Sequence, residues 1–347
     1  MSETAIRAHF EAQARACDDL GSPFTARLCR VLARILDRST VTGMAVLEWQ
    51  GNPRADALAL RLCGGLHALA LADADDGIAG AYPPASLDED RLAAEIDAAI
   101  RRNDEDLVRA LDSAPQTNEV GRAAMLLPGF LAIARHFDLP LAVAEIGASA
   151  GLNLNFDRFR YSCGASFWGD PASPVMLEPE VRGAPPPLES DLSIVSRHGC
   201  DIAPIDLADP AQRLRLRSYV WPDQTLRRQR QDAAIALALD NPVRLERADA
   251  AGFVHARLAD RPDGAVFVLF HTIMWQYMPR ATKDAILAAL DEAGANATPK
   301  RPIARLRMEP RDPNEPFATL SLTTWPGGGT ERLARCDYHG RWIEWMG

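Results

Sequence analysis

Apolar residues recur at helical spacing through the first third of the chain. Within residues 24–36, for example, Leu28, Leu32 and Ile35 lie three or four residues apart, so they fall on one face of a helix. The same spacing predicts further helices at residues 6–20, 55–71, 88–100, 105–111 and 120–137. We therefore expect the N-terminal part of the protein to be entirely helical.

After residue 140 the pattern changes to short apolar runs that alternate with helical segments. These runs lie at residues 141–144, 192–197, 243–247, 264–270, 303–308 and 319–324, and the tail 333–345 supplies one more. Strands that alternate with helices are typical of a parallel α/β sheet. The run 264–270 is the most hydrophobic of them, so we expect a fully buried central strand there. The sequence therefore predicts a doubly wound, mostly parallel sheet of seven strands with one late antiparallel strand.

These patterns divide the chain into two parts, a helical N-terminal part at residues 1–115 and an α/β part at residues 116–347. Residues of about 160–190 interrupt the α/β pattern, because they are rich in glycine and proline. We interpret them as an insertion that is compatible with a β-hairpin and lies outside the core.

Composition narrows the class of protein. The chain has 347 residues, of which 47% are hydrophobic and 24% charged, as expected for a globular protein with a large core. No apolar run is as long as a membrane span and the charged N-terminus does not resemble a secretory signal, so we expect a cytoplasmic protein without a membrane partner. A net charge of −9 argues against non-specific binding of nucleic acid. The six cysteines lack CxxC spacing, which favours reduced thiols over disulfides or zinc ligands.

The segment 141–155 carries the most informative motif. Its apolar run ends at Glu145, and a turn of small residues follows before the next helical segment. Because glycine has no Cβ, Gly147 and Gly151 would let a ligand approach the backbone of this turn. Unpaired N–H groups at the start of the next helix would then face a polar or anionic ligand. The alternative is an ordinary strand–turn–helix whose small residues serve packing.

The spacing of Glu145, Gly147 and Gly151 resembles the first motif of S-adenosylmethionine-dependent methyltransferases, an acidic residue followed by three alternating glycines. Ser149 stands where that motif has its middle glycine. The resemblance implies S-adenosylmethionine as the cofactor, and it implies that the loop at the methionine end consists of Glu145, Gly147, Ala148, Ser149 and Gly151. Asn153 is close enough to the turn to be a further contact. The G-x-G-x-x-G of nicotinamide enzymes is missing, which argues against a dinucleotide.

Acidic residues at the ends of two other predicted strands are further cofactor candidates. In a doubly wound sheet the acidic residue after the second strand often bonds a ribose hydroxyl, and Asp201 holds that place, with Asp206 in reserve. Asp201 could instead be an ordinary turn residue. The run 243–247 resembles the third methyltransferase strand, and this resemblance implies that Asp249 binds near the adenine.

The predicted central strand leads into a polar and aromatic segment at residues 271–277. Ligands of open α/β sheets bind at the carboxyl ends of strands, so we expect this segment to share a crevice with the glycine turn. His271 and Tyr277 are the candidate catalytic residues, with His271 as a general base near neutral pH. Trp275 and Gln276 are candidate substrate contacts. A buried histidine with its hydrogen bonds satisfied is the alternative for His271.

The start of the helix at 120–137 supplies two more candidates. In methyltransferases the helix before the first strand often passes beside the cofactor, which makes Asn118 and Arg122 candidate substrate contacts. In the structural alternative Asn118 simply caps this helix.

The chain also resembles a bacterial family of unknown function, domain-of-unknown-function family 2332. The similar segments are QTNEVGRAA at 116–124, EIGASAGLNL at 145–154, DRFRY at 157–161, SYVWPDQ at 218–224, HTIMWQY at 271–277 and HGRWIEW at 339–345. This resemblance implies a methyltransferase-like (Rossmann-like) fold with a helical extension, and it supplies no catalytic residues. We therefore expect a protein that binds S-adenosylmethionine and methylates a small molecule. A non-catalytic ligand-binding or scaffolding protein with the same fold is the alternative.

Overall fold

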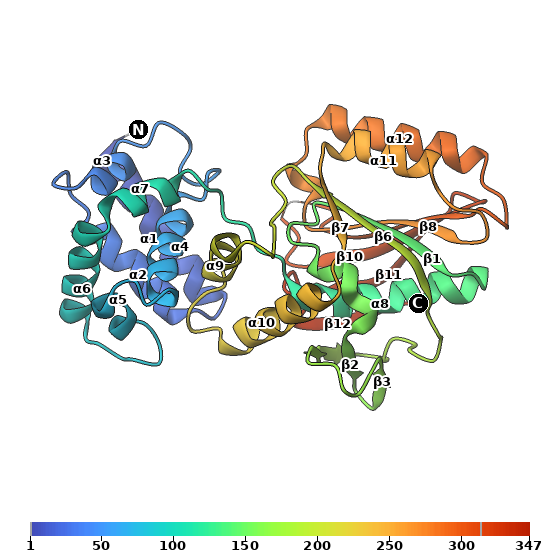
Figure 1. Ribbon diagram of the computed structural model, residues 1–347, viewed down its shortest axis with the longest axis horizontal. Helices are drawn as coiled ribbons and strands as arrows, with labels where there is room; N and C mark the ends of the chain where they lie inside the picture. The colour runs from blue at the N-terminus through green and yellow to red at the C-terminus, as the bar shows by residue number, and fades with distance from the viewer. Residues whose placement is uncertain (1, 313) are drawn as a thin grey trace. The chain divides into compact units, whose positions relative to one another are not determined.

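The computed structural model describes residues 2–312 and 314–347 and divides the chain into two compact units (Figure 1). The helical unit comprises Met1–Thr117 and Ala208–Gln229, and the α/β unit comprises Asn118–Leu207 and Arg230–Gly347. This division differs from the one read from the sequence in that a segment from the second half of the chain, 208–229, joins the helical unit.

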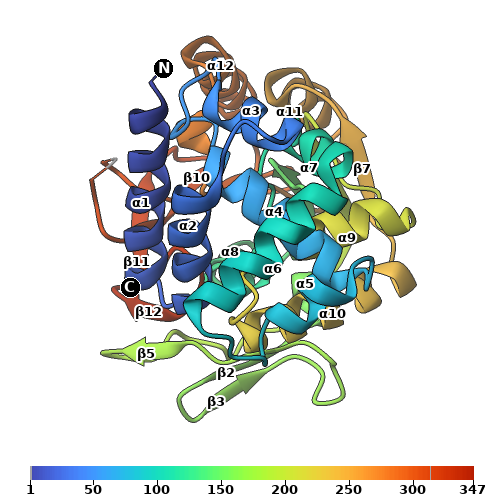
Figure 2. The same ribbon diagram turned by 90° about the vertical axis from the view of Figure 1, so that its left-hand side faces the viewer.

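The helical unit packs eight helices around its own core (Figure 2). They are α1 (Glu3–Asp19), α2 (Pro23–Ile35), α3 (Val41–Leu47), α4 (Leu58–Leu71), α5 (Asp76–Ala81), α6 (Glu89–Arg102), α7 (Asp104–Leu111) and α9 (Pro210–Ser218). Leu28 and Leu32 of α2 are buried, as the helical spacing predicts. Side-chain oxygens of Ser2, Thr40 and Asp75 cap the helices that follow them, which explains where α1, α3 and α5 begin.

Contacts made by residues 218–223 explain why 208–229 belongs to the helical unit. The Tyr219 ring lies where a side chain at Gly64 of α4 would stand, so the absence of a Cβ at Gly64 allows the close approach. The ring Nδ1 of buried His67 lies 2.9 Å from the carbonyl oxygen of Ser218. Asp223 accepts a hydrogen bond from the backbone N–H of Phe24 at 2.8 Å. These contacts join α9 and the segment after it to α2 and α4.

The α/β unit is built on a nine-stranded sheet in the order β5-β12-β11-β10-β9-β8-β1-β6-β7. Its strands are β1 (Leu141–Ile146), β5 (Glu180–Arg182), β6 (Ile194–Asp201), β7 (Arg244–Arg247), β8 (Val266–Thr272), β9 (Ile303–Glu309), β10 (Ala318–Trp325), β11 (Thr330–Cys336) and β12 (Trp342–Trp345). Neighbouring strands from β7 to β9 are parallel, as are β12 and β5. The pairs β9–β10, β10–β11 and β11–β12 are antiparallel.

The prediction of seven strands is therefore wrong, because the sheet has nine. Most neighbouring strands are parallel, but the sheet also contains antiparallel pairs. The tail forms two strands, β11 and β12, and β5 from the insertion adds an edge strand. Three strands, β10, β12 and β5, run opposite to the others, where one was predicted. The sequence missed β5 because three residues in a proline-rich segment give no pattern of their own.

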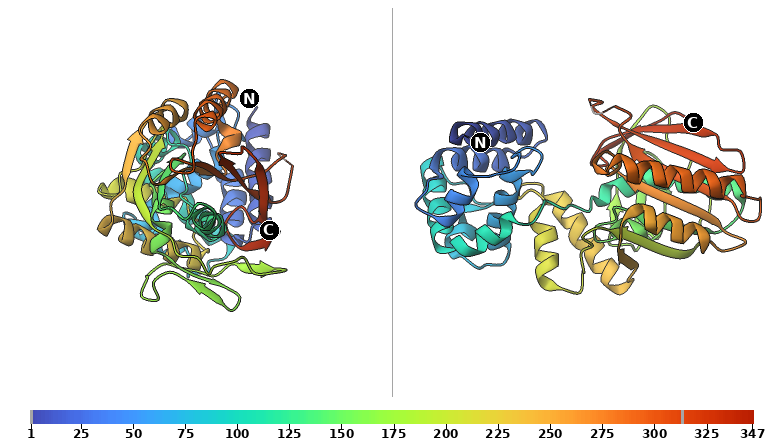
Figure 3. Two further views of the ribbon diagram at one scale, coloured as in Figure 1. Left: turned by 90° about the vertical axis from the view of Figure 1, so that its right-hand side faces the viewer. Right: turned by 90° about the horizontal axis from the view of Figure 1, so that it is seen from above.

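Helices cover both faces of the sheet (Figure 3). On one face lie α11 (Ala250–Ala259) and α12 (Arg280–Ala295), against which Leu269 of β8 packs. On the other lies α8 (Ala123–Phe137), where the Phe130 ring meets that of Phe270 edge-on at 5.2 Å. Because successive residues of a strand point to opposite faces, Leu269 and Phe270 identify the two faces of β8.

The α/β unit and its connection to the helical unit contain further elements. They are three 3-10 helices, η1 (Val120–Arg122), η2 (Leu152–Arg158) and η3 (Trp275–Tyr277), the helix α10 (Thr225–Asp240), and a small sheet of β2 (Arg160–Cys163), β3 (Ser166–Trp168) and β4 (Met176–Leu177). β2 and β3 form an antiparallel hairpin within the insertion. No helix in the described part of the chain is long and apolar enough to cross a membrane.

Candidate ligand-binding site

The carboxyl ends of β6, β1 and β8 lie side by side, and the motif turn follows the middle one. We call residues 147–151 the β1 loop. Gly147, Ser149 and Gly151 all have positive φ, of 68°, 54° and 70°. Glycine adopts such angles readily, whereas a serine does so at a cost of about 1–2 kcal/mol. The loop therefore holds its shape against some backbone strain at Ser149.

Five backbone N–H groups of this region already donate to the protein. The Ser149 N–H donates to Asp201 Oδ2 at 2.9 Å, and the Leu152 N–H donates to Asn118 Oδ1 at 2.8 Å. Further N–H groups that donate to backbone oxygens belong to Ala148, Gly151 and Leu154. In addition, the helix predicted after the turn is the 3-10 helix η2. The expectation of unpaired N–H groups that face an anionic ligand is therefore not supported.

The space beside the two glycines is filled, in two different ways. A side chain at Gly151 would meet branched carbons of Val243 and Leu245 at 2.9 and 3.0 Å. At Gly147 it would meet the Cγ and Cε of Met274 at 2.9 and 3.0 Å. Gly151 thus serves packing against fixed aliphatic groups, while Gly147 faces a single flexible side chain.

Three buried oxygen atoms around the β1 loop have no hydrogen-bond partner: Glu145 Oε2, Ser149 Oγ and Asn153 Oδ1. Their side chains are at most 5% exposed. Burial raises the pKa of Glu145 well above its ordinary value of 4.5, the charge of Asp201 raises it further, and Arg122 acts in the opposite direction. Each of these atoms can accept a hydrogen bond, so the loop offers acceptors to a ligand that carries donors.

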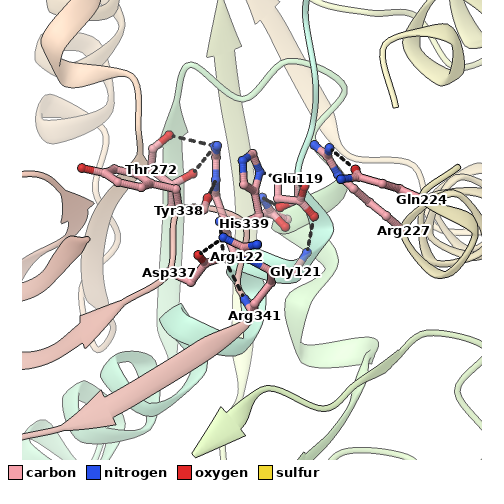
Figure 4. Close-up of polar contacts among 11 residues, drawn as sticks. Glu119, Gly121, Arg122, Gln224, Arg227, Thr272, Asp337, Tyr338, His339 and Arg341 are labelled. Carbon is pink, nitrogen blue, oxygen red and sulfur yellow. Dashed lines mark hydrogen bonds and ion pairs between the residues drawn. The ribbon is translucent and has the colours of Figure 1, made fainter. Parts of the chain in front are cut away.

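The segment Asn118–Arg122 connects the loop to the rest of the unit (Figure 4). Besides the bond from Asn118 to Leu152, Asn153 donates from its side chain to the carbonyl of Glu119 at 3.2 Å. Arg122 Nε donates to the carbonyl of Tyr338 at 2.9 Å, and its Nη1 lies 3.4 Å from both oxygens of Thr272. Both substrate candidates of this segment, Asn118 and Arg122, therefore lie beside the β1 loop and β8.

His271, the predicted base, lies in a closed polar network. Its Nδ1 is 2.7 Å from Glu309 Oε1 and its Nε2 is 3.2 Å from Arg305 Nη2. Because the Arg305 guanidinium can only donate, Nε2 accepts and Nδ1–H donates, which is the neutral imidazole. Burial lowers the pKa of His271 and also that of Arg305, to about 10. The Trp275 ring stacks on His271 at 5.0 Å and is 4.3 Å from the Arg305 guanidinium carbon.

The register of the sheet separates His271 from the motif acid. Glu145 pairs with Phe270, so its side chain is on the face of α8. His271 follows Phe270 and points to the face of α11 and α12, where its side chain has no exposed surface. The backbones of both residues are neighbours, as predicted, but the structure does not bring their side chains together.

The other predicted residues of this segment are more open. Gln276 is exposed, and Tyr277 is 77% exposed. At the strand ends, Asp201 holds the backbone N–H groups of Ser149 and Ala203, at 2.9 Å each. Asp249 is exposed and caps α11 through the N–H of Ala251 at 2.9 Å. Both acids thus have a structural role that accounts for their position.

Comparison with known proteins identifies the family. The chain matches, over residues 7–345, the family described as an uncharacterized protein conserved in bacteria (DUF2332). The protein belongs to this family. No curated protein and no solved structure gives a significant match to the chain. The DUF2332 match runs from α1 to β12 and so includes both units.

Two elements of the site in this DUF2332 protein were missed in the sequence. Glu309, at the end of β9, accepts hydrogen bonds from His271, from the Met274 N–H at 3.1 Å and from the Trp275 N–H at 3.2 Å. The sequence offered one signal for Glu309: it is the acidic residue that ends a buried strand, in the segment Arg-Met-Glu-Pro.

The second missed element is the turn between β11 and β12. Gly340 has φ of 76° and lies so close to the Gly121 backbone that a Cβ there would overlap the Gly121 carbonyl. In the same turn, His339 Nδ1 is 3.5 Å from Glu119 Oε2, and Arg341 pairs with Asp337 at 2.8 Å (Figure 4). The turn therefore fixes the segment that carries Arg122. In the described residues, no three His, Cys, Asp or Glu side chains are grouped to hold a metal ion.

Proposed function

We propose that this protein binds S-adenosylmethionine at the β1 loop and transfers its methyl group to a small molecule. The observation that carries the proposal is the set of buried acceptor atoms without partners at Glu145, Ser149 and Asn153, next to the carboxyl end of β1. Such atoms are costly when left unpaired, by about 1–3 kcal/mol each, so a ligand that donates to them gains that free energy.

The character of these atoms favours a cationic ligand. The β1 loop offers oxygen acceptors, whereas its backbone N–H groups at Ala148, Ser149 and Gly151 already donate to the protein. S-adenosylmethionine carries an ammonium group and a sulfonium, and a dinucleotide carries a negatively charged pyrophosphate instead. The parallel order β7-β6-β1-β8-β9, with the motif at the end of the middle strand, places the loop where open α/β sheets bind ligands.

S-adenosylmethionine supplies a methyl group on a positively charged sulfur, and its transfer requires a nucleophile held in line with that bond. In this chain, Glu145 would accept hydrogen bonds from the ligand, and Asn118 and Asn153 would hold the loop in place. Arg122, on the same face, would orient a substrate. His271 is enclosed, so proton removal from a substrate is not assigned to it.

Isothermal titration with S-adenosylhomocysteine, which keeps the ammonium group, tests the proposal. Burial raises the pKa of Glu145 and a cation beside it lowers that pKa, so binding at a pH between the two values should release a proton to the buffer. The measured enthalpy should then change with the ionisation enthalpy of the buffer. Glu145→Gln should abolish that dependence, whereas Glu331→Gln on the exposed surface of β11 should keep it.

The outcomes separate clearly. Folded protein that gives no heat up to millimolar ligand contradicts the proposal. Binding that depends on Glu145 but yields no methylated product in a broad acceptor screen supports the second candidate, a ligand-binding protein without catalysis. That candidate is favoured by one observation, the enclosed His271 ring, because no predicted base faces the β1 loop.

A further inference from the structure

We propose that Met274 is the specificity-determining residue of the β1 loop, a movable side chain that a ligand must displace to reach the Gly147 backbone. This inference rests on the proposed function, since it concerns access to the same site. It starts from an observation that the function does not explain. The glycine of the motif does not face open space, because three side-chain carbons of Met274 lie around its missing Cβ, at 2.9 Å (Cγ), 3.0 Å (Cε) and 3.1 Å (Cβ).

The backbone of Met274 is fixed. Glu309 Oε1 accepts the Met274 N–H at 3.1 Å and the Trp275 N–H at 3.2 Å. The Ile273 N–H donates to the Met308 carbonyl at 3.0 Å, and the Tyr277 N–H donates to the Met274 carbonyl at 3.1 Å. Glu309 is itself buried and bonded to His271. The loop after β8 therefore does not need to open for the site to change shape.

The side chain of Met274 packs against the core cluster of α11 and α12, and under this proposal it changes its rotamer when a ligand enters. Methionine is unbranched and has three rotatable bonds, so it adapts to different shapes at little cost. Met274 is partly exposed, which leaves a direction in which it can turn. At Gly151, by comparison, the space is filled by the branched ends of Val243 and Leu245, of which the β-branched Val243 is stiff at χ1. The β1 loop thus has one closed side and one side closed only by a methionine.

This arrangement defines which ligands enter. Under this proposal, a ligand that reaches from the unpaired acceptors to the Gly147 backbone takes the volume that the Met274 side chain fills. An apolar or soft group at that position, such as the region around the sulfur of S-adenosylmethionine, would then contact the displaced thioether. Met274 therefore favours ligands with an apolar part next to their cationic end, over small ammonium compounds that lack one.

Two substitutions test the role of Met274 by titration with S-adenosylhomocysteine. Met274→Ala removes the side chain that fills the space, and if the open rotamer is populated about a tenth of the time, affinity should rise about tenfold. Met274→Ile keeps a side chain of similar volume but makes it stiff at χ1, so affinity should fall. Met278→Ala, at the end of the same segment and in the core cluster of α11 and α12, is the matched control and should leave affinity unchanged.

Each outcome has a distinct meaning. Tighter binding by the alanine variant together with weaker binding by the isoleucine variant supports the inference, as does binding by the alanine variant alone. Equal affinity of the wild type and both Met274 variants overturns it and leaves the proposed function standing. No binding by any of the four proteins overturns the proposed function and this inference with it. Thermal unfolding of each variant verifies that the proteins compared are folded.

Discussion

Glu145→Gln should be more stable than the wild type, and this difference in the free energy of unfolding should grow as the pH rises. Burial first, and then Asp201, raises the pKa of Glu145 in the folded protein above its ordinary 4.5. The folded state therefore binds one more proton than the unfolded state between 4.5 and the raised pKa. Stability from this group is fully present below 4.5 and is lost as the pH rises through the folded pKa, because the proton has to be removed from a buried carboxyl group.

The size of the effect follows from that single proton. Within the window, the free energy of unfolding of the wild type falls by about 1.4 kcal/mol per pH unit relative to Glu145→Gln. Glutamine has the same shape and stays neutral, so every other titrating group contributes equally to both proteins. The difference should stop growing at the folded pKa of Glu145, which the experiment thereby measures.

Urea unfolding at a series of pH values from about 5 to about 8 provides the free energies by linear extrapolation. Glu331→Gln, on the exposed surface of β11, is the control and should run parallel to the wild type. If Glu145→Gln also runs parallel to the wild type over this range, Glu145 is ionised in the folded protein. The reasoning from burial, and with it the predicted proton release on ligand binding, would then be refuted.

Three further substitutions probe the supports of the site, each measured by urea or thermal unfolding. Glu309→Ala leaves three N–H donors without their acceptor, of which that of His271 is buried, and should cost about 2–3 kcal/mol. Glu309→Gln keeps an acceptor and should cost less, and equal losses would contradict the role of the hydrogen bonds. Gly340→Ala should lower stability by more than about 2 kcal/mol, since its Cβ overlaps Gly121. Gly183 has the same φ of 76° but open surroundings, so Gly183→Ala should cost only about 1–2 kcal/mol, from backbone strain alone. Ser149→Gly relieves a positive φ and should stabilise the protein by up to about 1 kcal/mol, and a clear loss of stability would show that the hydroxyl has a structural partner.

Local sequence patterns were sufficient to predict most elements of the sheet. The apolar runs that became β1, β8 and β9 are bounded by turn residues, and the structure confirms strands there. The helices α3 and α5, of seven and six residues, were missed because they span too few turns to show a period. The tail was read as one strand because its break at 337–341 is held by a turn that packs on Gly121, far away in sequence.

The composition of the site was partly predictable, but its geometry was not. The motif pointed correctly to a turn after β1, in which Gly147 and Gly151 have positive φ. It could not reveal that Met274 fills the space beside Gly147, because that contact depends on how β1 and β8 pair. The same pairing decides that Glu145 and His271 point to opposite faces of the sheet. A shift of the register between β1 and β8 by one residue would have placed both side chains on the same face.

The discontinuous helical unit has a consequence for the order in which the chain folds. Its first 117 residues leave the ribosome early, yet Tyr219 and Asp223, which complete contacts with α2 and α4, are made only after β1 and β6. During synthesis the helical bundle therefore remains incomplete, with the surface around Gly64 uncovered, until much of the α/β unit has been made. A fragment that ends at Thr117 would lack the contacts of Tyr219 and Asp223. A version of the helical unit made on its own therefore has to include residues 208–229, joined to residues 1–117.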